Sequence, residues 1–166
     1  MARKCFFSFH YKPDNWRVSK VRNIGAIEGN KPASDNDWET VTGGGNKRIK
    51  EWIADQMKGR SCTVILAGEN TANRKWINHE IVESWNKGMG VLVIYIHNIT
   101  DVSDKQSTKG ANPLYYITHG STEKRLSTIA KAYDPPCTTS KGVYNYIADN
   151  IDDWIEDAIQ IRKNNG

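Results

Sequence analysis

Glu80 is the side chain best placed for chemistry in this chain, because it follows Trp76 by four residues in a segment with helical spacing. Residues four apart share one face of a helix, so the carboxylate and the indole are expected to lie side by side. A carboxylate beside a large indole is screened less by water and acts more strongly on a nearby positive charge. A glutamate on a helix is in most cases a surface residue without a chemical role. The residues around Glu80 therefore decide between a chemical role and a surface position.

Two histidines follow apolar segments that are expected to form strands. His10 comes at the end of KCFFSFH, and His97 at the end of VLVIYIH. The carboxyl ends of parallel strands form the edge where α/β proteins bind ligands, so both could contact one. A structural role is the alternative for each. The four histidines have no i, i+4 partner and no Gly-x-Ser-x-Gly motif occurs, so neither a metal centre nor a nucleophile elbow is indicated.

The elements that must position Glu80 lie within residues 62–97. Thr63–Ala67 and Val91–Ile96 are short apolar runs, typical of buried parallel strands. Between them, Lys75–Lys87 carries apolar residues spaced for one helical face. A strand, a helix and a strand over this length predict a right-handed βαβ unit.

The segment before this unit gives one clear strand and weaker signals. Lys4–Tyr11 alternates in the manner of a strand, with Cys5, Phe7 and Phe9 opposite Phe6, Ser8 and His10. Pro13–Asp14 predicts a turn, Trp16–Ile24 a weakly patterned helix, and Gly25–Thr42 a long loop.

Three glycines at 43–45 then precede Asn46, a candidate N-cap for an amphipathic helix through Met57. Glycines before a helix can cradle a phosphate, but the P-loop spacing is absent and a flexible connection is the preferred interpretation.

The last part of the chain predicts a short strand and a long helix. Ser127–Tyr133 is the strand candidate, and Ser140 is a candidate cap for the helix that follows. The helix, Val143–Ile161, is expected to pack on the sheet through Tyr146, Ile147, Ile151, Trp154 and Ile155. The element order predicts a three-layer α/β domain, residues 1–166, with a small, mainly parallel central sheet and helices on both faces.

Composition excludes several classes of protein. The net charge of +4 is spread over scattered basic residues, so a nucleic-acid partner is not indicated. No apolar run is long enough to cross a membrane and no leader is present, so a soluble, cytoplasmic protein is expected. The three cysteines are an odd number without metal-binding spacing and are expected to be reduced thiols.

Several segments together resemble a known family. ILAGENTANRKWINHEI is similar to the strand, loop and helix of TIR domains that end in Trp-x-x-x-Glu. FFSFHY, GMGVLVIYIHNITD, the cluster at Gly110–Pro113 and the late Tyr133–Asp134 extend the resemblance to a bacterial TIR-like family that includes the TIR subunit of Thoeris anti-phage defence.

The resemblance implies a flavodoxin-like TIR fold and an enzyme that acts on NAD as a substrate, with no separate cofactor and no metal. Glu80 matches the catalytic glutamate of the motif, and Trp76 matches its tryptophan. The first strand of the family lines the nucleotide pocket, which makes Phe6, Phe7, Ser8 and His10 the expected substrate-binding residues.

The implied product is a nucleotide derived from ADP-ribose that activates a separate effector protein, and self-association is possible for such domains. The alternative is a TIR-like interaction module without catalytic activity, in which Glu80 is incidental. The sequence leaves open the exact nucleotide, the trigger and the effector.

Overall fold

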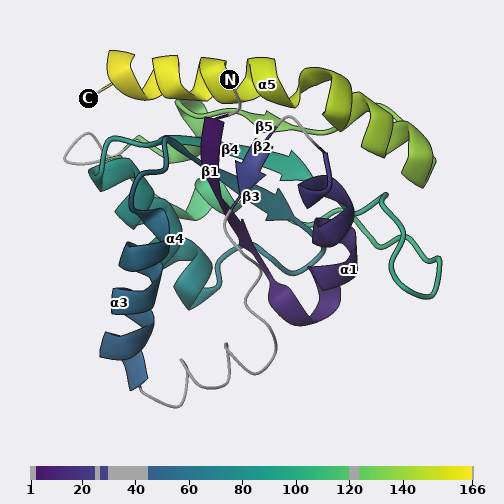
Figure 1. Cartoon of the computed structure of the whole chain (residues 1–166), viewed down its shortest axis with the longest axis horizontal. Helices are drawn as coiled ribbons and strands as arrows, with labels where there is room; N and C mark the ends of the chain where they lie inside the picture. The colour runs from purple at the N-terminus through teal and green to yellow at the C-terminus, as the bar shows by residue number, and fades with distance from the viewer. Residues whose placement is uncertain (1–2, 25–26, 30–44, 120–123, 166) are drawn as a thin grey trace.

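The computed structural model describes residues 3–24, 27–29, 45–119 and 124–165, and the glycine-rich segment before Gly45 lies outside them (Figure 1). Parallel strands alternate with helices along most of the chain. The strands are β1 (Arg3–Phe9), β2 (Ile27–Gly29), β3 (Cys62–Ala67), β4 (Gly90–Tyr95) and β5 (Ala132–Tyr133). The helices are α1 (Tyr11–Arg22), α3 (Gly45–Met57), α4 (Lys75–Asn86) and α5 (Ser140–Asn164), with short 3-10 turns η1 (Pro113–Tyr116) and η2 (Leu126–Thr128).

The sheet has the order β2-β1-β3-β4-β5, and every neighbouring pair is parallel. Strands β3 and β4 are buried along their whole length, as continuous apolar runs require. The predicted adjacency of the first, second and third apolar segments is confirmed, because β3 pairs with β1 on one side and β4 on the other. The order also confirms the expected βαβ unit and the α/β class.

Helices cover both faces of the sheet, as predicted (Figure 1). On one face α1 and α5 pack against alternate strand residues, Phe7 and Val64 among them. On the other face α4 and the two 3-10 turns pack on Ile65 and Val93, while α3 packs on Phe6. The alternation of side chains along β1 therefore sends Phe6 and Phe7 into different cores.

Three local predictions were wrong at the amino-terminal side. The turn at Pro13–Asp14 is instead the first turn of α1, which begins at Tyr11. A proline is tolerated there because the first amides of a helix have no partner within it. Of the predicted loop Gly25–Thr42 the structure describes only residues 27–29, which form β2, an edge strand too short to show alternation. The rest of that prediction lies outside the described residues. Helix α3 begins at Gly45, so Asn46 lies inside the helix and is not its cap.

The carboxyl-terminal predictions were right in outline. Ser127–Tyr133 contains η2 and only a two-residue strand. Thr139, one residue before the predicted cap, accepts a hydrogen bond from the Gly142 amide at 3.1 Å and caps α5. Tyr146 was expected to face the sheet but is exposed, and Trp154 is half-buried, stacking on Tyr133 at 4.4 Å between ring centroids. The other stripe residues, Ile147, Ile151 and Ile155, are buried as predicted.

Gly90 lets α5 approach β4 closely. A Cβ atom at this position would lie 2.7 Å from the Ile159 nitrogen and 2.8 Å from the Ala158 carbonyl carbon, both backbone atoms of α5. Gly90→Ala is therefore expected to lower the free energy of unfolding by about 1–3 kcal/mol, the usual cost of overpacking. Urea denaturation measures this, with the exposed Lys87→Ala as a control expected to stay within about 0.5 kcal/mol of the parent. An equal, small effect of both changes would mean that α5 moves outward freely.

None of the helices in the described residues is long and apolar enough to cross a membrane.

Candidate active site

The strand order changes direction between β1 and β3, which are neighbours in the sheet although β2 intervenes in the sequence. In open α/β sheets, ligands bind outside the carboxyl ends of the strands at such a point. The chain leaves β1 through His10 alone and enters α1 at once, whereas residues 68–74 connect β3 to α4. The candidate site is therefore framed by the start of α1, the β3–α4 loop and α4.

Glu80 lies on α4 and faces inward. Its exposure is 9%, and burial raises the pKa of its carboxyl from 4.5 to about 8, opposed by a hydrogen-bonding interaction with the Ser8 hydroxyl. The helix turn that carries it is fixed to the sheet, because Ser84 Oγ donates to the Glu80 carbonyl at 2.6 Å and lies 2.6 Å from Thr63 Oγ1. Glu80 is thus a desolvated carboxyl on a rigid support, and its pKa is raised by burial.

Ser8 is the residue of β1 that faces Glu80. Its side chain points to the same side of the sheet as Phe6. Its Oγ is buried and has no hydrogen-bond partner among the described residues. Phe6 is buried under this part of the site in contact with the α3 core. Phe7 is also buried, but its side chain packs with α1 and α5 on the opposite face. The structure therefore brings Ser8 and Phe6 toward Glu80 and turns the Phe7 side chain away.

His10 is half-buried at the carboxyl end of β1. Its Nδ1 atom is buried and has no hydrogen-bond partner among the described residues. Burial is the main cause that lowers the pKa of its imidazole below 6.5, and the positive charge of Arg74 adds to it. A neutral imidazole with an unpaired ring nitrogen at the mouth of the site can exchange hydrogen bonds with a polar ligand.

Trp76 is half-buried one turn before Glu80 on α4. Its indole packs at the margin of the core formed by Phe6 and α3, and it meets His79 edge to face at 5.6 Å between ring centroids. Lys75 Nζ lies 4.9 Å from the indole centroid. Trp76 thus forms an apolar wall between α3 and α4 on the side of the sheet that carries Glu80.

His97, the other strand-end histidine, lies beyond β4 and contacts different groups. It is 8% exposed, it meets Tyr95 at 6.3 Å between ring centroids, and its Nδ1 has no partner among the described residues. Burial lowers the pKa of His97, while the charge of Asp134 raises it. No group of three or more histidine, cysteine, aspartate or glutamate side chains able to hold a metal occurs within the described ranges.

Sequence reasoning missed two charged residues beside the site, Asp14 and Arg17. They are 2% and 4% exposed, and Arg17 NH1 lies 3.2 Å from Asp14 Oδ1. Their i, i+3 spacing on one helix was a visible signal, but a helix was not predicted at Asp14.

The arrangement suits a cationic ligand that loses its positive charge as it reacts. Burial is the largest cause that raises the pKa of Glu80, and among the described residues the Ser8 hydroxyl opposes it. A ligand with a positive charge would lower this pKa and ionise the carboxyl. The carboxylate would then act on that charge at reduced dielectric, where electrostatic interactions are strong.

Two comparisons with known proteins bear on the site. A family model described as "Thoeris protein ThsB, TIR-like domain" matches residues 6–101, which include β1 from Phe6, α4 and Glu80. The chain is also similar to "Putative cyclic ADP-D-ribose synthase ThsB1" of Bacillus cereus (strain MSX-D12), with 33% identity over 122 residues. The alignment covers 70% of this chain and 64% of the relative, so the chain spans less than two thirds of the relative's length.

Proposed function

This chain belongs to the Thoeris ThsB TIR-like family, and from that premise we propose that it cleaves the bond between nicotinamide and ribose in NAD and forms a cyclic nucleotide from the ADP-ribose part. The observation that carries the proposal is the desolvated Glu80 carboxyl beside Ser8 at the switch point of the sheet. The name of the Bacillus relative, a cyclic ADP-D-ribose synthase, supports the product class.

The chemistry needs little more than this carboxylate. Nicotinamide in NAD carries the positive charge, so it leaves as a neutral base with the electron pair of the broken C–N bond. The ribose C1 atom then becomes oxocarbenium-like, and a carboxylate held close to it stabilises the developing charge. A nucleophile from the adenosine half captures C1 to give a cyclic product, whereas capture by water gives ADP-ribose.

Each predicted substrate residue receives a role in this proposal. Ser8 donates a hydrogen bond to ionised Glu80, and His10 binds a polar group of the substrate through its unpaired ring nitrogen. Trp76 supplies an apolar wall, and Phe6 supports β1 from the core. Phe7 contributes through its backbone position, because its side chain lies on the other face.

We further propose that the product acts on a separate effector protein, as the resemblance to the TIR subunits of Thoeris defence implies. NAD is then a substrate that is consumed, not a resident cofactor. The self-association of TIR-like domains would place several sites together, and the nucleotide would carry the signal away from them.

The test is to incubate the purified chain with NAD and to follow nicotinamide and nucleotide products by chromatography from pH 6 to 9. Because kcat/KM reports the free enzyme, it is expected to rise as the pH passes through about 8, where free Glu80 ionises, and to level off about one unit higher. A second measurement is a crystal structure with a non-hydrolysable NAD analogue. An analogue bound away from Glu80, or a profile that falls over this range, would contradict the proposal and favour the interaction-module alternative.

A further inference from the structure

Asp14 and Arg17 form a buried ion pair on the first turns of α1, directly after the strand that carries Ser8. Arg17 NH1 lies 3.2 Å from Asp14 Oδ1, and both side chains are almost completely buried. A buried ion pair is costly to desolvate and is retained only where its geometry is well satisfied. Among the described residues, the groups that contact this pair come from two loops at the carboxyl edge of the sheet, although Asp14 Oδ2 has no hydrogen-bond partner among them.

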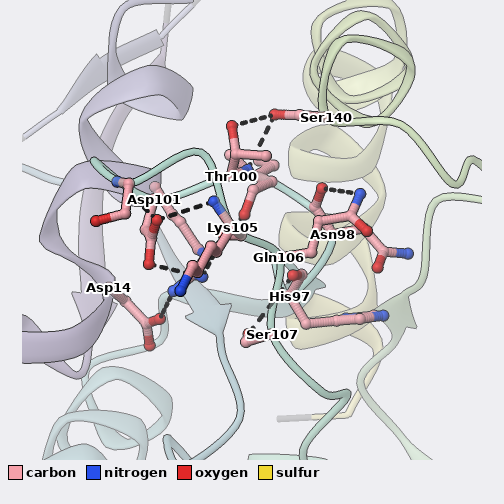
Figure 2. A network of polar contacts seen from close by, with 12 residues as sticks. Asp14, His97, Asn98, Thr100, Asp101, Lys105, Gln106, Ser107 and Ser140 are labelled. Carbon is pink, nitrogen blue, oxygen red and sulfur yellow. Dashed lines mark hydrogen bonds and ion pairs between the residues drawn. The ribbon is translucent and has the colours of Figure 1, made fainter.

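Arg17 binds the loop that follows β4. Its Nε donates to the Ile99 carbonyl at 2.7 Å, and its NH2 donates to the Lys105 carbonyl at 2.9 Å, with Asp101 Oδ2 at 3.8 Å. Figure 2 shows Asp101 and Lys105 of this loop near Asp14, with His97 at the start of the loop and Ser107 after Lys105. The planar guanidinium thus connects three backbone and side-chain acceptors that a smaller cation could not reach together.

Asp14 contacts the loop between β3 and α4. A Cβ atom at Gly68 would lie 2.2 Å from Asp14 Oδ2, so the carboxylate rests directly on this residue. The buried Thr71 hydroxyl interacts with Asp14 and accepts a hydrogen bond from the Gly68 amide at 2.8 Å. A Cβ atom at Gly110 would lie 2.5 Å from the Gly68 and Glu69 carbonyl oxygens. The start of the β3–α4 loop is therefore held between α1 and the segment at Gly110.

These contacts place the pair between the two halves of the candidate site. His10 immediately precedes α1, while the β3–α4 loop leads into the helix that carries Glu80. We propose that Arg17, acting through Asp14, is a positioning residue that fixes the distance between the Ser8–His10 half and the Glu80 half of the site. The inference rests on the proposed function and adds a residue to it that does not touch the substrate.

The variant that tests the inference is Arg17→Lys. Lysine keeps the positive charge beside Asp14, so the buried carboxylate is not left uncompensated. A lysine at position 17 cannot donate to the Ile99 carbonyl, the Lys105 carbonyl and the Asp14 carboxylate together. The two loops should therefore lose the contacts that connect them. Asp14→Asn is the second variant, because it removes the charge while keeping the shape that packs on Gly68.

Lys20 provides a matched control. It lies one turn further along α1, and its Nζ donates to the Thr100 carbonyl at 3.1 Å and to Thr100 Oγ1 at 2.9 Å. Lys20→Gln therefore weakens the same loop–helix contact without touching the ion pair, Gly68 or Thr71. An effect of loosening this loop–helix contact in general should therefore appear in Lys20→Gln as well as in Arg17→Lys.

Steady-state nicotinamide release should separate the variants. In Arg17→Lys we expect kcat to fall about tenfold to a hundredfold, because a displacement of about 1 Å costs this much, while KM changes little. Asp14→Asn should change kcat in the same direction, and Lys20→Gln should stay within about twofold of the parent. Similar kcat values in Arg17→Lys and Lys20→Gln, or a change confined to KM, would overturn the inference.

Amide hydrogen exchange gives a second readout that needs no NAD. Exchange across residues 68–74 should be faster in Arg17→Lys than in Lys20→Gln, and unchanged exchange would also overturn the inference. If the parent chain released no nicotinamide, the proposed function would fail instead. The exchange comparison would then still decide whether Arg17 fixes the β3–α4 loop.

Discussion

Glu80→Gln is expected to lower the rate of nicotinamide release by about a hundredfold to a thousandfold, the usual effect of losing one well-placed electrostatic group. Glutamine keeps the size of the side chain beside Ser8, but it cannot ionise when a cationic substrate arrives. The loss should appear in kcat, because the charge acts on the oxocarbenium-like state and less on the bound substrate. Steady-state kinetics with chromatographic detection of nicotinamide measure it.

Glu83→Gln is the matched control for this change. Glu83 lies on the same helix, but it is half-exposed and pairs weakly with Lys87 at 4.0 Å. Exposed pairs of this kind contribute little, so nicotinamide release should stay within about twofold of the parent. Equal rates for Glu80→Gln and the parent would rule out a catalytic role of the Glu80 charge, and the interaction-module alternative would gain support.

The same Glu80→Gln variant is expected to be more stable than the parent at neutral and alkaline pH. The folded pKa of Glu80 is about 8, above the unfolded value of 4.5, so protonation favours the folded chain. The stability from this protonation is fully present below pH 4.5 and is lost as the pH rises through about 8. Glutamine does not titrate, so the variant escapes this loss.

The advantage of the variant should grow by on the order of 3–4 kcal/mol between pH 5 and pH 9, at about 1.4 kcal/mol per pKa unit. Urea denaturation of both proteins at pH 5, 7 and 9 measures the difference. Glu83→Gln, as the exposed control, should follow the parent at each pH. A constant difference across this range would show that the Glu80 carboxyl is hydrated and has an ordinary pKa.

Glu80→Gln is thus expected to lower activity and to raise stability. The side chain that the proposed reaction needs therefore lowers the stability of the folded chain. Burial disfavours the charged form of the Glu80 carboxyl, and under the proposed function the positive charge of NAD would favour it. Active sites often carry such strain, and removing it commonly raises stability while it lowers activity.

The sequence predicted the centre of the sheet because the information there is local. Thr63–Ala67 and Val91–Ile96 are continuous apolar runs, and burial on both sides leaves this mark in the sequence. Strand β2 left no such mark, since it has three residues and, among the described strands, pairs with β1 alone. Helix α1 was recognised only in its second half, because a proline near a helix start also reads as a turn.

Part of the candidate site could be predicted from the Trp-x-x-x-Glu motif and from the alternation of side chains along β1. The spacing of Glu80 and Trp76 predicted that they share one face of α4, and the resemblance predicted their roles and that of Ser8 at the candidate site. The same alternation places the Phe7 side chain on the opposite face of the sheet from Phe6 and Ser8. The resemblance covers the whole strand and does not distinguish its two faces. Asp14 and Arg17 could not be assigned a role, because their partners at Gly68, Ile99 and Lys105 are distant in the sequence.

The single-residue connection between β1 and α1 has a consequence for engineering this chain. His10 alone separates Phe9 from Tyr11, so the junction contains no spare length. Inserting one residue would turn α1 by about 100° relative to the sheet, since a helix has 3.6 residues per turn. That rotation would carry Asp14 away from Gly68 and move Val18 out of the core. The mouth of the site can therefore be redesigned by substitution at His10, whereas insertions and deletions at this junction would disrupt the helix packing itself.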